Sequence, residues 1–256
     1  MEKYTLITGA SSGIGRSIAL AFAKEGRKLI LTADKNKDGL LQTKELALKE
    51  YAKAFGDIPA SYYECETFIC DVADPKAADN LFDELDKKEF RIEALINNAG
   101  ISCFELVQDM SVNTWQRVMN TNLSGAFYMC RKVIPEMIRA KKGCIINVSS
   151  YWGIAGSAME SAYSASKGGL NAFTLSLAKE LKESNIRVNA IACEFVDTKM
   201  NSLFNNEEVE DILKEMPSGR VIDPEEIADM AARLIRPECT VTGQILGMDK
   251  LKASFF

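Results

Sequence analysis

Short runs of apolar and β-branched residues alternate with longer segments of helical periodicity along almost the whole chain. This rhythm favours parallel strands joined by crossover helices, because a tight turn cannot connect parallel neighbours. The sequence therefore predicts an α/β fold built on a doubly wound parallel sheet of about seven strands. The expected strands cover residues 4–8, 28–32, 67–70, 94–96, 143–148, 187–192 and 244–247.

Length and composition favour a single domain over residues 1–256. A chain of this size with 47% hydrophobic residues can bury a full core but is short for two independent enzyme domains. Residues 34–66 hold a helical pattern at 40–55 and an extra loop around Ile58 and Pro59, and we interpret this stretch as an insertion after the second strand. Residues 199–220 are expected to cover the substrate.

Charge and composition exclude several classes of function. A net charge of −5 gives no general attraction for polyanions, so neither nucleic acid nor a membrane surface is an expected partner. Seven scattered cysteines without a C-x-x-C pair, and no leader before the strand at Tyr4, favour a cytoplasmic protein with reduced thiols. Histidine is absent, which removes histidine-based hydrolysis and most zinc sites.

A glycine-rich turn, from Thr8 to Gly15, directly follows the first predicted strand and opens a helix over residues 16–26. Glycines at such a turn let the backbone approach a ligand closely, so that the helix amides and dipole can hold a pyrophosphate. Taken alone, the motif also fits a plain connection between a strand and a helix. The residues expected to bind a dinucleotide here are Gly9, Ser11, Ser12, Gly13, Ile14 and Gly15.

A second motif sets Tyr163 and Lys167 four residues apart at the start of a helix that runs to about Glu183. This spacing brings the phenol and the ammonium group to one helical face. A fixed cation favours the phenolate, so Lys167 would lower the pKa of Tyr163 and make the tyrosine an acid/base. An isolated pair of this kind also fits a half-buried aromatic beside a solvated lysine.

The two motifs, taken with four others, resemble the short-chain dehydrogenase/reductase family over nearly the whole chain. The resemblance implies a Rossmann-type sheet, a nicotinamide cofactor, and a catalytic set of Asn122, Ser150, Tyr163 and Lys167. The overall pattern looks most like that of bacterial 3-oxoacyl-acyl-carrier-protein reductases. The four further motifs are Asp71-Val72, Asn97-Asn98-Ala99-Gly100, Asn122-Leu123 and Ser149-Ser150.

The resemblance implies a role for each catalytic residue. Tyr163 would give a proton to the developing alkoxide, and Ser150, with Ser149 as its rival, would hydrogen-bond the same oxygen. Lys167 would also hold the nicotinamide ribose, and Asn122 would position a water that links Lys167 to solvent.

The resemblance also implies the residues around the rest of the cofactor. Asp71 would accept from the adenine amino group, and the Val72 backbone would contact the adenine ring. The remaining contacts would be Asn98, Ala99 and Gly100 beneath the ribose, and Val196 and Thr198 at the carboxamide.

The end of the second strand decides the cofactor prediction. Asp34 lies about 20 residues beyond the glycine-rich turn, where an acidic side chain accepts from the ribose hydroxyls of NAD and repels the 2′-phosphate of NADP. In an alignment with the family, Asp34 falls one position later than the NAD-selecting aspartate, where NADP-dependent members carry arginine. Lys35 and Lys37 are close enough in sequence to reach a phosphate. We predict NAD(H) as the favoured cofactor, with NADP(H) as the alternative.

Three segments depart from the expected pattern. Cys193 and Glu194 replace the Pro-Gly of the family, which would reshape the nicotinamide pocket or offer a thiol nucleophile. Residues 249–251 replace Asp-Gly-Gly, and the apolar ending at 253–256 would either pack against a partner chain or form a tail. Asp34 to Glu45 has the spacing of an EF-hand calcium loop, but a strand precedes it, so we favour a polar turn that caps a helix from Leu40 and predict no metal site.

The substrate is predicted only by class. A small carbonyl or alcohol compound is expected, which an acyl carrier protein would deliver if Arg139, Lys141 and Lys142 form a basic docking spot. Sugar, polyol and steroid dehydrogenation are the alternatives, and a non-catalytic nucleotide-binding regulator is a third. We expect a homo-oligomer, either a dimer or a tetramer. The side chains expected to line an apolar substrate pocket are Tyr151, Trp152, Phe195, Met200 and Phe204.

Overall fold

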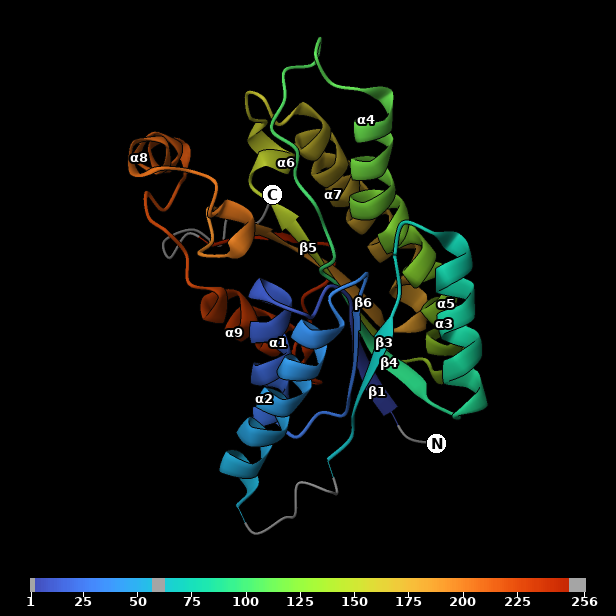
Figure 1. Ribbon diagram of the computed structural model, residues 1–256. Coiled ribbons are helices and arrows are strands. Elements are labelled where there is room, and N and C mark those ends of the chain that lie inside the picture. The colour runs from blue at the N-terminus through green and yellow to red at the C-terminus, as the bar shows by residue number, and fades with distance from the viewer. Residues whose placement is uncertain (1–2, 57–62, 249–256) are drawn as a thin grey trace.

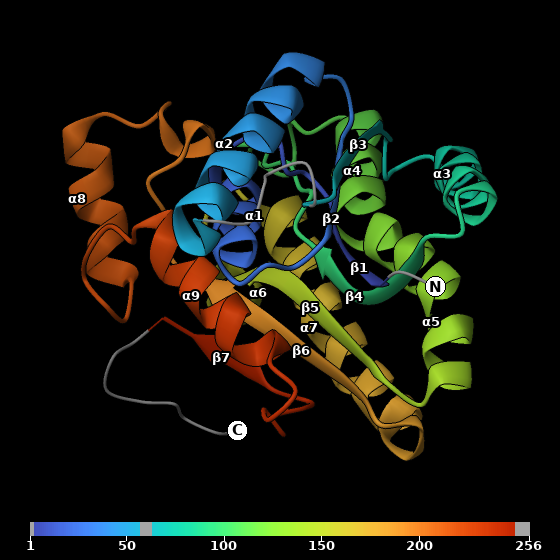
Figure 2. The same cartoon turned by 90° about the horizontal axis from the view of Figure 1, so that it is seen from below.

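A computed structural model describes residues 3–56 and 63–248. Its centre is a parallel sheet in the order β3-β2-β1-β4-β5-β6-β7, with helices on both faces (Figure 1, Figure 2). All seven predicted strands are present, and the largest difference is that β4 begins at Arg91 instead of Ala94. The strands are β1 (Lys3–Ile7), β2 (Leu29–Ala33), β3 (Cys65–Ile69), β4 (Arg91–Asn97), β5 (Gly143–Ser150), β6 (Ile186–Cys193) and β7 (Ile245–Gly247).

The helices connect successive strands as crossovers, which confirms the predicted doubly wound α/β class. Among the described residues, no helix is both long and apolar enough to cross a membrane. The helices are α1 (Gly13–Lys24), α2 (Lys37–Phe55), α3 (Pro75–Lys87), α4 (Val112–Met119), η2 (Asn120–Ser124), α5 (Gly125–Ala140), α6 (Trp152–Ala155), α7 (Ser161–Leu181), η3 (Lys182–Ser184), η4 (Lys199–Asn201), α8 (Asn206–Glu215) and α9 (Pro224–Ile235).

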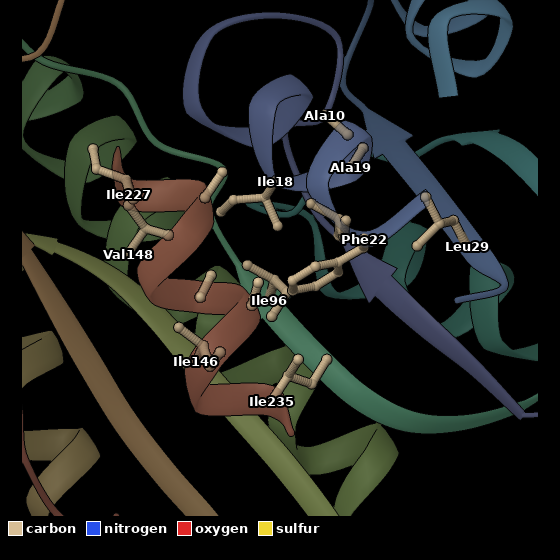
Figure 3. Packing of buried hydrophobic residues seen from close by; sticks show 14 of the residues in the cluster. Ala10, Ile18, Ala19, Phe22, Leu29, Ile96, Ile146, Val148, Ile227 and Ile235 are labelled. Atoms are coloured by element: carbon tan, nitrogen blue, oxygen red, sulfur yellow. The ribbon is translucent and has the colours of Figure 1, made fainter. Parts of the chain in front are cut away.

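Each face of the sheet has its own hydrophobic core. The buried residues of α1, α2 and α9 pack on one face, where Phe22 and Ile18 belong to the same cluster as Ile96 and Ile146 of the central strands (Figure 3). The buried residues of α3, α5 and α7 pack on the other face. Because side chains alternate along a strand, a central strand buried on both faces is rich in apolar residues throughout its length. β2 follows this rule, since all five of its residues are buried and four of them are apolar.

The segment after β2 differs in part from its prediction. Its helix α2 begins at Lys37, three residues before the predicted Leu40, because the Asn36 side chain accepts a hydrogen bond from the Gly39 amide at 3.0 Å and caps the helix there. The loop around Ile58 and Pro59 lies outside the described residues, as does the C-terminal stretch 249–256. That residues 34–66 form an insertion stays a prediction.

The basic residues that suggested a carrier docking spot lie at the opposite end of β5 from Ser150. Arg139, Lys141 and Lys142 precede the first residue of β5, whereas Ser150 is its last. At a rise of about 3.3 Å per residue, the two ends of the strand are roughly 23 Å apart. This placement argues against carrier docking at the spot, where Arg139 and Lys142 pair with Glu136 and Glu93.

Candidate active site

A cavity of about 550 Å³ opens at the carboxyl ends of the strands, where the strand order reverses between β1 and β4. This is the usual place for a ligand in an open α/β sheet. Of the residues predicted for the site, Gly15 and Asn122 do not line the cavity. Those that do are Gly9, Ser11, Ser12, Gly13, Ile14, Asp34, Asp71, Val72, Asn98, Ala99, Gly100, Ser150, Tyr163, Lys167, Val196 and Thr198.

The glycine-rich turn is shaped for close contact with a ligand. Gly9 has φ +66°, and a Cβ at this position would lie 2.8 Å from Ala99 Cα, so a larger residue would strain the turn and push its neighbour away. The turn leads into α1, and the side chain of the N-cap residue Ser12 makes no capping hydrogen bond. The first amides of α1 are therefore suited to bind the pyrophosphate of a dinucleotide.

The turn after β4 is tied to the glycine-rich turn. Thr8 Oγ1 accepts hydrogen bonds from the amides of Asn98 and Ala99 at 3.0 and 3.1 Å. In return, Asn98 Nδ2 donates to the carbonyl oxygens of Thr8 and Gly9. These bonds hold two turns that are far apart in sequence as one rigid wall of the cavity.

Lys167 lines the cavity but is almost fully buried. Its Nζ donates to the Val148 carbonyl oxygen at 2.7 Å and lies 5.7 Å from the centroid of the Tyr163 ring. Burial lowers the pKa of Lys167 to about 8. The lysine is therefore ready to exchange a proton near neutral pH.

Tyr163 lies one helical turn before Lys167, as the spacing predicts. Burial raises the pKa of Tyr163, and a hydrogen bond with Ser150 opposes that rise. The expected lowering of the tyrosine pKa is therefore not found in the protein alone, because desolvation of the phenolate outweighs the stabilising contacts. At neutral pH the phenol carries its proton.

The two adjacent serines point in different directions, because alternate side chains of β5 lie on opposite faces of the strand. Ser149 Oγ donates to the Lys167 carbonyl oxygen at 3.3 Å. Ser150 Oγ accepts from the Trp152 amide at 3.1 Å and is also hydrogen-bonded to Tyr163. The geometry therefore favours Ser150 over Ser149 as the partner of the tyrosine.

Asn122 lies in the π-helical turn η2, between α4 and α5. Its side chain exchanges two hydrogen bonds with the backbone of Ile101, at 2.8 and 2.9 Å, and donates to Ser166 Oγ at 3.0 Å. Asn122 thus fixes the loop after β4 against the helix that carries Tyr163 and Lys167. A π-turn of this kind often marks a functional position.

Arg117 was not singled out by the sequence. It lies on α4, and its Nη1 contacts Asp71 Oδ2 at 2.8 Å while its Nη2 contacts Asp34 Oδ2 at 3.4 Å. Burial acts to raise the pKa of Asp71, but hydrogen bonds from Arg117 and the Ala73 amide outweigh it and hold that pKa below its usual range. No motif marks this arginine, because its partners follow strands far away in sequence.

Glu194 and Cys193 have structural roles at the end of β6. The Glu194 carboxylate is buried and accepts two hydrogen bonds from Ser218, one from the amide at 3.0 Å and one from the hydroxyl. It therefore joins the end of β6 to the chain beyond α8. Burial raises the pKa of Cys193 to about 12, which is incompatible with a thiolate nucleophile at neutral pH.

The other end of the cavity is largely apolar. Trp152, Phe195, Met200 and Phe204 line it as predicted, whereas Tyr151 does not line it and packs beside the Trp152–Phe195–Met216 cluster. Several further lining residues were not predicted from the sequence, because they lie in segments without a marked pattern. They include Ser102, Phe104, Glu160, Leu203, Ile212 and Met216.

The calcium-like segment does not form a loop. Asp38, Gly39 and Glu45 all lie within helix α2, so their positions follow the helix axis and cannot wrap around one ion. Within the described residues, no group of three or more cysteine and acidic side chains is arranged to hold a metal.

Comparisons with known proteins agree with this geometry. The family model for short chain dehydrogenases matches residues 3–209. The chain is 37% identical over 248 residues to the 3-oxoacyl-acyl-carrier-protein reductase FabG of Thermotoga maritima, covering 96% of each chain. It is also 37% identical over 250 residues to the uncharacterized oxidoreductase YmfI of Bacillus subtilis, covering 97% of this chain and 98% of that one. A solved structure of a candidate gluconate dehydrogenase from Agrobacterium tumefaciens superposes with a TM-score of 0.86 at 28% identity, covering 96% of this chain and 94% of the other.

Proposed function

This chain belongs to the short chain dehydrogenase family, and from that premise we propose that it interconverts a ketone and a secondary alcohol with a nicotinamide cofactor. The observation that carries the proposal is the cluster of Ser150, Tyr163 and Lys167 at the cavity. A bound nicotinamide cofactor supplies or accepts the hydride.

Tyr163 is the proton donor in ketone reduction and the acceptor in alcohol oxidation. Because burial keeps its phenol protonated, the tyrosine rests in the form that can give a proton to a developing alkoxide. Ser150 donates to the same oxygen and stabilises the charge that forms there. Lys167, when protonated, favours the phenolate that remains, and Asn122 holds the loop from which a water can resupply the proton.

Replacing Tyr163 tests this mechanism. Tyr163→Phe removes the proton donor and keeps the ring, so turnover should fall at least about 100-fold while cofactor affinity changes little. Turnover is followed by cofactor absorbance over a panel of ketones and alcohols, and affinity by titration. Tyr151→Phe is the matched control, since Tyr151 lies next to the cavity without lining it. A Tyr163→Phe variant with the wild-type rate would refute the mechanism.

The third candidate, a non-catalytic regulator, predicts a different result in the same assay. A wild-type protein that binds the cofactor but turns over no compound of the panel would favour the regulator. The retention of all four expected catalytic residues supports the enzyme instead.

The favoured cofactor is NAD(H). Asp34 lines the cavity. We assign it to the adenosine half of the cofactor, where its carboxylate can accept from both ribose hydroxyls and repels a 2′-phosphate. We expect Asp34→Arg to move the ratio of catalytic efficiencies toward NADP(H) by about tenfold or more. Measuring kcat/KM with both cofactors for both proteins checks this, and a wild-type preference of tenfold or more for NADPH would contradict the assignment.

The apolar end of the cavity supports an aliphatic 3-oxoacyl substrate, delivered as a carrier-protein thioester or as a free compound. The similarity to the FabG reductase points the same way. Glu160 favours the alternative of a hydroxylated sugar or polyol, because its buried carboxylate is an acceptor within an apolar surface. The relative rates of 3-oxoacyl thioesters and polyols in the panel distinguish the two.

We further propose that the protein is a cytoplasmic homo-oligomer. All seven cysteines are free, which suits a reducing compartment. Helices α4, α5 and α7 expose Trp115, Phe127 and Leu175, and an exposed apolar face of this kind is typical of contact with a second copy of the chain. Residues 199–220 are proposed to cover the bound substrate, since α8 packs its Ile212 and Leu213 toward Trp152 and Phe195.

A further inference from the structure

Arg117 lies between the two carboxylates proposed for the adenosine half of the cofactor. Helix α4 carries it on one side of the cavity, while Asp34 follows β2 and Asp71 follows β3. Its two terminal nitrogens reach one carboxylate each, at 3.4 and 2.8 Å. One guanidinium group therefore spans the rim where the ribose and the adenine are proposed to lie.

The charges at this rim nearly balance. Asp34 and Asp71 contribute two negative charges, and Arg117 together with Lys35, whose Nζ is 3.9 Å from Asp34 Oδ2, contributes two positive ones. A 2′-phosphate entering here would meet a paired group of charges, in place of the two free carboxylates that the sequence suggests. The repulsion expected from Asp34 is correspondingly weaker.

Arg117 also keeps the capacity to bind a phosphate. A guanidinium group has five N–H donors in a planar fork that matches phosphate oxygens, and two contacts leave donors to spare. The side chain is 43% exposed, so it can turn from Asp34 toward a ligand without disturbing the core. The Lys35 side chain is 89% exposed, and its contact with Asp34 is longer than either contact of Arg117. Lys37 does not line the cavity.

We propose that Arg117 determines how this chain discriminates between NAD(H) and NADP(H). With NAD(H), its guanidinium group holds Asp34 and Asp71 in position to accept from the ribose and the adenine. With NADP(H), the guanidinium group moves to the 2′-phosphate and neutralises its charge. NADP(H) can then bind in spite of Asp34. The inference rests on the proposed use of a nicotinamide cofactor.

The test measures binding without turnover. Adenosine 2′,5′-bisphosphate and adenosine 5′-monophosphate differ in the 2′-phosphate alone, and calorimetry gives the Kd of each for wild type, Arg117→Met, Arg117→Lys and Lys35→Ala. We expect Arg117→Met to weaken the bisphosphate about tenfold or more and the monophosphate less than about threefold. Arg117→Lys should restore part of the loss, because it restores the charge without the planar fork.

Three outcomes overturn the inference. An equal loss for both probes in Arg117→Met would make the arginine a structural support, and no loss for either would remove its role. A larger loss in Lys35→Ala would move the phosphate site to the lysine. In each of these cases the wild type still binds a nucleotide, so the proposed function stands. A wild type that binds neither probe would refute both the role of Arg117 and the proposed function. Thermal melting of each variant confirms that it is folded.

Discussion

At the scale of the residue, burial is what sets the chemistry of Lys167. Its ammonium group is removed from water and donates to the Val148 carbonyl oxygen, and its pKa falls from 10.5 to about 8. A lowered lysine pKa means that the unfolded chain binds the proton more tightly than the folded one between these two values. Stability therefore rises as the pH rises through that window.

Lys167→Met removes this titration and keeps much of the side-chain volume. The free energy of unfolding of the wild type, minus that of the variant, should increase by about 1 kcal/mol between pH 7 and pH 9. Urea unfolding of both proteins at the two pH values measures it. A difference that stays constant with pH would show that the folded lysine has an ordinary pKa.

At the scale of the element, Glu194 joins β6 to the end of the proposed substrate cover. Both of its hydrogen bonds come from Ser218, beyond the C-terminus of α8. Figure 1 shows α8 set apart from the helices that pack on the sheet. Glu194, which replaces the glycine of the family pattern, therefore restrains the proposed substrate cover.

Glu194→Ala should loosen that restraint. We expect the substrate KM to rise about tenfold with little change in kcat or in cofactor Kd, because hydrogen bonds to a charged acceptor contribute about 1.5–3 kcal/mol. The KM of Glu194→Gln should lie between those of the wild type and Glu194→Ala, because the amide oxygen of glutamine still accepts a hydrogen bond. Glu215→Ala, an exposed residue at the end of α8, is the matched control. A rise in cofactor Kd with an unchanged KM would show that Glu194 acts on the nicotinamide instead.

At the scale of the whole molecule, the exposed face of α4, α5 and α7 predicts self-association. Phe127 is 45% exposed and stacks edge-on against Phe173, at 6.4 Å between ring centroids, which joins α5 to α7. Light scattering should find a dimer or tetramer for the wild type and a shift toward the monomer for Phe127→Glu. Leu41→Glu changes a similarly exposed residue on α2 and should leave the assembly intact. A monomeric wild type would contradict the proposal.

Much of the fold could be predicted, because its determinants are local. The period of apolar residues marks strands and helices wherever burial demands it, and this was enough for all seven strands. The glycine-rich turn and the Tyr163–Lys167 spacing are equally local, and the cavity brings both together. Helix boundaries were less certain, as α2 shows, because a single capping side chain decides where a helix begins.

The sequence by itself determined the α/β class, the family and the residues of the proposed catalytic cluster, because each is written in short spacings along the chain. Only the tertiary structure decided which distant side chains meet. Arg117 reaches Asp71 across 46 positions, Glu194 reaches Ser218 across 24, and the basic run at Arg139 proves remote from the cavity. The physical reason is that such contacts depend on the lateral order of the strands and on which end of each strand faces the cavity, and neither is visible in a local pattern.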